Sequence, residues 1–255
     1  MVGDQVHDVR DVGPEVEGAD RSILVRHPKY GGPMQAGMIL ALREQGDECI
    51  AFFPMMEGLP VPLWIEAVRT WDNGVEGTVS ACYKEVSPVV FFAPRFLAEA
   101  REFRPGEEVV VHLSAIALEV GPSTFNKIIS TNGGIYELEL KKFLEADPAR
   151  TAEDFKVPVD EMKGMWWMVP TKYETIWKFH SPVRAIEMVD FLGRGLLRMR
   201  IELLVFEKPY ECYLYVPERL LGNYVPAVED EIQGLLWMTG QIAPWYGSKD
   251  GGGGR

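Results

Sequence analysis

Residues 162–180 hold the densest group of recognition-type side chains in this sequence, with three tryptophans, three methionines and three lysines. Tryptophan and methionine form adaptable contact surfaces, and aromatic rings interleaved with lysines can stack the bases of a single strand. The pattern therefore predicts a partner-binding surface. Its candidate residues are Met165, Trp166, Trp167, Met168, Tyr173 and Trp177.

The same segment has a second interpretation. Large aromatic side chains bury roughly 150–250 Å² each, and most of them do so inside the protein. The segment would then fold back over the end of a barrel and belong to the core. The sequence leaves both interpretations open, and the exposure of Trp166 would decide between them.

The other reactive side chains form no catalytic motif. The histidines are His7, His27, His112 and His180, and no two of them share an element, as a zinc site requires. The sequence has no GxSxG nucleophile elbow and no framed phosphate loop, and Leu192-Gly193-Arg194-Gly195 is interpreted as a turn. We therefore expect no catalytic residue, no metal and no cofactor.

Acidic side chains cluster at Glu107-Glu108 and at 229–231. Consecutive side chains on a strand point to opposite faces, so solvated turns are the favoured interpretation. A hydrolase remains the alternative. It requires Glu107, Glu108, Glu231 and His112 to converge in one cleft.

Composition restricts the choice of partner and compartment. The 255 residues carry a net charge of −12, which disfavours binding to phosphate backbones. Cys49, Cys82 and Cys212 are far apart and odd in number, so we expect free, buried thiols in a reducing cytoplasm. No apolar run has the length of a signal peptide or of a membrane span.

Short apolar runs separated by turn residues indicate hairpins that would position these groups. Residues 65–71 and 75–82 flank Asp72-Asn73-Gly74, and Asn-Gly is the strongest local signal for a hairpin. Residues 135–140 are interpreted as a strand after Asn132-Gly133-Gly134. Residues 34–44 fit a strand or a helix, and Gly37 favours the strand.

One strand pattern occurs twice. An aromatic strand ends at Pro94, and after an acidic turn a second strand opens at Val109. The same interval separates Pro217 from the strand that opens at Ile232. This suggests an internal duplication, although few of the paired residues are identical.

We therefore expect a mainly β protein of barrel or sandwich architecture, built from short antiparallel hairpins with little helix. Two tandem barrels of OB or SH3-like type are the specific form considered. The predicted parts are an arm (1–33), a first β unit (34–125), a second β unit (126–246) with an insertion near 145–180, and a flexible tail (247–255).

The leading functional hypothesis is a non-enzymatic cytoplasmic binding or accessory protein that acts by protein–protein contact, with self-association as a further option. Single-stranded nucleic-acid binding is the first alternative, with base stacking on Tyr173, Trp177, Tyr213 and Tyr215. The hydrolase is the second alternative.

Overall fold

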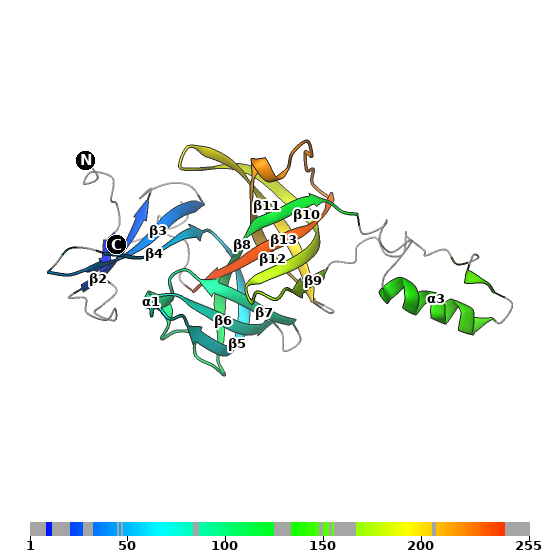
Figure 1. Cartoon of the computed structure of the whole chain (residues 1–255), viewed down its shortest axis with the longest axis horizontal. Helices are drawn as coiled ribbons and strands as arrows, with labels where there is room; N and C mark the ends of the chain where they lie inside the picture. The colour runs from blue at the N-terminus through cyan, green and yellow to red at the C-terminus, as the bar shows by residue number, and fades with distance from the viewer. Residues whose placement is uncertain are drawn as a thin grey trace, which may run out of the picture.

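The computed structural model describes residues 9–11, 21–27, 33–44, 46, 48–83, 87–124, 134–147, 150–152, 155, 167–205 and 208–242. The elements in chain order are β1 (Val9–Asp11), β2 (Arg21–His27), β3 (Met34–Leu42), β4 (Glu48–Met56), β5 (Leu59–Thr70), β6 (Gly77–Tyr83), β7 (Ser87–Ala93), α1 (Phe96–Glu99), β8 (Glu108–Pro122), α3 (Gly134–Ala146), β9 (Trp167–Pro170), β10 (Ile176–Phe191), β11 (Arg194–Val205), β12 (Lys208–Pro217), the 3-10 helix η3 (Glu218–Leu220) and β13 (Glu231–Gln241). Figure 1 shows their arrangement.

Strand β5 illustrates how the sequence selects this architecture. Val61, Leu63 and Ile65 are buried, whereas Pro62 and Trp64 between them are exposed. Successive side chains of a strand point to opposite faces. One face of β5 therefore lies in the core and the other lies outside.

The described strands form two sheets. β1 to β4 make an antiparallel sheet in that order, and the other nine strands make a sheet in the order β11-β12-β8-β5-β6-β7-β13-β10-β9. Two further pairings, β10 with β11 and β8 with β13, join strands that are distant in this order. The larger sheet, seen in Figure 1, therefore curls on itself.

The pairings trace two rings that share one ladder. The first ring passes through β5, β6, β7, β13 and β8, and the second passes through β10, β11, β12, β8 and β13. Ala115 pairs with Met238 in the shared β8–β13 ladder. Interior side chains of both rings, Phe91 and Met199 among them, belong to one hydrophobic cluster.

The four-stranded sheet packs on the outer side of the first ring. Phe53 and Met55 of β4 are buried together with Phe92 of β7 and Leu97 of α1. The rings of Phe53 and Phe92 meet edge to face, with their centroids 6.3 Å apart. Aromatic packing of this kind fastens the small sheet to the large one.

Much of the predicted architecture is confirmed. The protein is mainly β, with barrel-like curvature, antiparallel hairpins and little helix. The turn between β5 and β6 contains Gly74 with φ 72°, in the left-handed region that favours glycine. The more specific expectation of two tandem OB or SH3-like barrels stays a prediction.

The interpretation of residues 135–140 as a strand is wrong, because they belong to α3. Glutamate, leucine and lysine are the most frequent residues of α3, and they are strong helix formers. Lys141 and Glu145 lie one turn apart with their charged atoms separated by 3.8 Å. Gly134 therefore begins a helix here instead of closing a hairpin.

Candidate functional site

The fold separates the residues predicted to form a partner-binding surface. Met165 and Trp166 lie outside the described residues. Trp167 opens β9, and its backbone pairs with that of His180 in β10. The segment therefore enters the larger sheet at Trp167.

Met168 and Trp177 belong to the core. They are 4% and 3% exposed within the main hydrophobic cluster, and the indole N–H of Trp177 donates to the carbonyl oxygen of Val90 at 3.0 Å. Tyr173 is 57% exposed, and the Lys172 ammonium lies 5.0 Å from its ring centroid. The fold thus brings Met168 and Trp177 into one cluster and leaves Tyr173 on the surface.

The groups that the hydrolase hypothesis needs do not converge. Glu108 begins β8 directly after Glu107, and His112 follows on the same strand. Glu231 opens β13, whose first partner in the shared ladder is Pro122 at the far end of β8. The length of β8 therefore separates the two acidic clusters.

A different histidine has two polar neighbours. Nε2 of the buried His180 lies 2.7 Å from Ser123 Oγ and 3.6 Å from a carboxylate oxygen of Glu231. In a catalytic triad the acid binds the ring nitrogen that the serine does not use. Here both groups approach Nε2, so the cluster ties β8, β10 and β13 together without the geometry of a triad.

The described part of the chain contains neither a metal-ligand cluster nor a membrane-spanning helix. No group of three or more histidine, cysteine or acidic side chains could hold a metal ion there, and no described helix is long and apolar enough to span a membrane. None of the three cysteines forms a disulfide; Cys82 and Cys212 are buried, whereas Cys49 is exposed, contrary to expectation. Burial raises the pKa of the Cys212 thiol, which keeps it protonated and unreactive.

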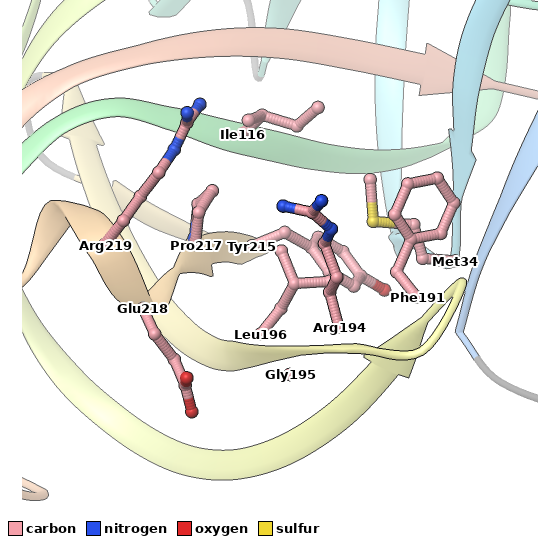
Figure 2. A pocket seen from close by; sticks show the side chains of 10 residues that line it. All are labelled: Met34, Ile116, Phe191, Arg194, Gly195, Leu196, Tyr215, Pro217, Glu218 and Arg219. Atoms are coloured by element: carbon pink, nitrogen blue, oxygen red, sulfur yellow. The ribbon is translucent and has the colours of Figure 1, made fainter.

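A cleft of about 510 Å³ opens on the outer side of the second ring (Figure 2), and its volume is that of an ordinary ligand site. It combines an apolar lining with a charged rim. The lining residues are Met34, Ile116, Phe191, Arg194, Gly195, Leu196, Tyr215, Pro217, Glu218 and Arg219.

The β10–β11 hairpin forms one wall of the cleft. It turns through Leu192 and Gly193, with φ values of 53° and 76°, and this turn places Phe191 opposite Arg194. Positive φ at both central residues matches the twist of the flanking strands. The carboxylate of Asp190 accepts a hydrogen bond from the Gly193 N–H at 3.2 Å, which holds the turn.

The second wall begins at Pro217, the last residue of β12. Proline has no N–H to continue a ladder, and the chain passes directly into η3. None of the η3 residues is buried. Glu218 and Arg219 therefore stand at the mouth of the cleft.

Tyr215 forms the floor. Its side chain is fully buried, and its hydroxyl lies 3.0 Å from the carbonyl oxygens of both Pro33 and Glu57. A phenol donates a single proton, so the two carbonyls share it. Burial raises the pKa of Tyr215, so the floor stays neutral.

Arg194 and Arg219 supply the positive charge of the rim. In Figure 2 their guanidinium groups reach over the cleft, and the Glu218 carboxylate points the opposite way. Neither arginine has an acidic partner among the described residues, and both side chains are exposed. Two cations thus face an apolar hollow in an acidic protein.

Arg198, on the same strand as Arg194, shows the contrast. It binds the carboxylates of Glu57 and Glu187 and lies 4.3 Å from the ring centroid of Tyr213. Burial opposes its charge, but the hydrogen bond to Glu187 and the nearby Glu57 keep the pKa of Arg198 above its ordinary value. Arg198 is therefore a structural cation.

Sequence reasoning missed this site. The motif Leu192-Gly193-Arg194-Gly195 fits a turn, and no motif in the sequence distinguishes Arg219. Each arginine lies beside a strand end, which was a usable signal. Their proximity depends on the pairing of β11 with β12, in which Leu196 lies opposite Pro217, and no local pattern fixes that pairing.

Comparison with known proteins gave no match to a family model, to a curated sequence or to a solved structure. The functional conclusion therefore depends on the geometry of the cleft.

Proposed function

We propose that this protein is a non-enzymatic binding protein that acts by contact with another protein, and that the cleft receives a segment of that partner. The observation that carries the proposal is the pair Arg194 and Arg219. They have no acidic partner among the described residues, yet the chain has a net charge of −12. A guanidinium in this state is available for bidentate binding of a carboxylate.

The cleft suits a segment that combines an apolar side chain with a carboxylate. The apolar side chain would pack on Phe191, Leu196 and Tyr215, and the carboxylate would reach the two arginines. A hydrogen bond to a charged group contributes about 1.5–3 kcal/mol. Apolar burial adds about 25 cal/mol per Å².

The nucleic-acid alternative has less support. Of the four rings assigned to base stacking, Trp177 and Tyr215 are buried. The Tyr213 ring is already covered by the Arg198 guanidinium. The net charge also repels a phosphate backbone.

A cytoplasmic location is part of the proposal. Three cysteines without a disulfide are typical of a reducing compartment.

We also infer that the two rings arose from two copies of one strand unit, β5–β8 and β10–β13. In the first copy, the β5–β6 register shifts after Ile65, the residue that follows Trp64, and Trp64 is the last β5 residue paired with β8. In the second copy, the β10–β11 register shifts after Val183, the residue that follows Pro182, and Pro182 is likewise the last β10 residue paired with β13. Bulges tend to be kept within families, so their matching positions support a common origin.

The ring closures match as well. Phe92 of β7 pairs in parallel with Thr239 of β13, and Tyr215 of β12 pairs in parallel with Ile116 of β8. Phe92 and Tyr215 stand at the same distance before Pro94 and Pro217. The fourth strand of each copy, β8 or β13, therefore also belongs to the ring of the other copy.

A selection of random peptides displayed on phage against the full chain tests the proposed function. We expect the selected peptides to share an aromatic or aliphatic residue next to an acidic one. Fluorescence anisotropy with a labelled consensus peptide should show a loss of affinity of about tenfold or more in the Arg194→Glu/Arg219→Glu variant, since each lost contact is worth 1.5 kcal/mol or more.

The matched control is Lys172→Glu/Lys178→Glu, which changes the net charge equally on exposed residues beside Tyr173. This control should bind the peptide like the wild type, apart from a small general effect of charge. If the control lost binding and the cleft variant kept it, the recognition surface would lie at Tyr173 and the cleft assignment would be wrong.

A further inference from the structure

The outer face of the first ring already carries a docked segment. Val75, Phe92 and Leu97 are buried beneath Ile39 and Phe53 of the β3–β4 hairpin. The docked segment is extended chain, and it inserts aromatic and aliphatic side chains into the face of the ring. This contact shows what one copy of the strand unit binds.

The matching face of the second ring is the cleft. Tyr215 holds in β12 the place that Phe92 holds in β7, because both pair in parallel with the strand that closes their ring. Met34 and Met56 of the β3–β4 hairpin reach the edge of this face and are buried with Tyr215. Beyond them, no described residue covers the cleft between the turn of the β10–β11 hairpin and η3.

We infer that the cleft docks an extended segment of a partner protein in the way that the first ring docks the β3–β4 hairpin. This inference rests on the proposed function, because it names the form of the segment that the proposed site receives. The partner's aromatic or aliphatic side chain lies on Tyr215, as Phe53 lies on Phe92. Its acidic side chain lies beside Arg219 and Arg194.

The arginines distinguish the open face from the covered one. Arg219 follows Pro217 at the same distance at which Phe96 follows Pro94 in the first copy, and Phe96 is buried. The β10–β11 ladder is also longer than the β5–β6 ladder at the end next to its turn. Arg194 lies in this additional part of the ladder. At these two positions the open face carries positive charge and the covered face does not, which favours an acidic partner.

Photo-crosslinking tests the inference. The consensus peptide carries a benzophenone side chain in place of its apolar residue, and adducts with the full-length protein are mapped by mass spectrometry. We expect adducts within residues 191–196 and 215–219. The same peptide with its acidic residue changed to the amide should bind about tenfold more weakly.

The possible failures are distinguishable. Binding that is insensitive to Arg194→Glu/Arg219→Glu would remove the proposed function, and the inference with it. Binding that depends on the arginines, with adducts only outside these ranges, would overturn the inference alone. So would displacement of the peptide by phenylpropionate at equal concentration, which would indicate a small-molecule site. A dimer in sedimentation that dissociates in Arg194→Glu/Arg219→Glu would assign the face to a second copy of this chain.

Discussion

The two strand units that we propose to be copies, β5–β8 (the first copy) and β10–β13 (the second copy), differ most in the connection that follows their third strand. In the first copy this connection is part of the core: Phe96 is 4% exposed and Phe103 is 2% exposed. In the second copy η3 contains no buried residue, and Arg219 stands in solvent at the cleft. One connection packs into its ring, and the other leaves a cleft beside it.

The two units fill the same region of the core from different parts of the chain, the first from the connection and the second from a strand. A side chain at Gly77 would meet the Phe96 ring, since a Cβ placed there lies 2.6 Å from it. Leu197 corresponds to Gly77, because each of them pairs with the residue just before the proline of its unit. Leu197 packs against the main cluster. Because Leu197 fills this space from the strand, the connection of the second copy is free to carry Arg219.

The first connection is also fixed by a buried ion pair. Arg95 and Glu99 are separated by 3.1 Å with 6% and 4% of their side chains exposed. Glu99 accepts a further hydrogen bond from the backbone N–H of Ile242 at 2.9 Å, which ties α1 to the end of β13. The second copy has Gly222 at the place of Glu99, so it cannot form this link.

The largest expected effect is that of Phe96→Ala. Truncation of a buried phenylalanine leaves a cavity, and we expect a loss of about 3–5 kcal/mol in the free energy of unfolding, measured with denaturant. Arg219→Ala at the matching position should change it by less than about 0.5 kcal/mol. Gly77→Leu/Phe96→Ala should recover part of the loss, because it copies the packing of the second ring. Equal losses in Phe96→Ala and Arg219→Ala would contradict the comparison.

Tyr215→Phe makes the floor of the cleft chemically equal to Phe92. The variant leaves the carbonyls of Pro33 and Glu57 without the hydroxyl donor, and we expect a loss of about 1–3 kcal/mol in the free energy of unfolding. Phe92→Leu, a control without a polar atom, should leave these two carbonyls hydrogen-bonded to Tyr215. Full stability of Tyr215→Phe would show that this bond does not fasten the small sheet.

The smallest effect concerns Glu76, which stands in the first copy at the place of Leu196. Burial raises the pKa of Glu76, although the hydrogen bond from Asn73 acts in the other direction. A raised pKa in the folded state means that ionisation costs stability above that pKa, and the cost is absent below the ordinary value of 4.5. Glu76→Gln should therefore raise Tm at neutral pH, and the gain should vanish in acid. A gain in Tm that persists below pH 4.5 would show that the gain does not come from the ionisation of Glu76.

The fold could be predicted largely from local pattern, and the site could not. The turn at Gly74 and the strand pattern around Pro94 and Pro217 are local signals, and the structure contains the elements that they indicate. Residues 135–140 failed because a short apolar run fits a strand or a helix, and its helix formers decided the outcome. The cleft depends on long-range pairings, such as Tyr215 with Ile116, which no single segment encodes.

The sequence leaves open whether Met168 and Trp177 are buried or exposed. Their types fit a recognition surface and a core alike, and only the pairing of β9 and β10 within the larger sheet places them inside. The isolated motif around Gly193 was correctly interpreted as a turn, but its role as a wall of the cleft requires β12 beside it.

The most direct test of the central claim is hydrogen–deuterium exchange of the full-length protein with and without the selected peptide. The account predicts slower exchange of the backbone amides in residues 191–196 and 215–219 in the complex, with residues 171–178 unchanged. Protection confined to residues 171–178, or an equal pattern in the free and bound protein, would contradict it.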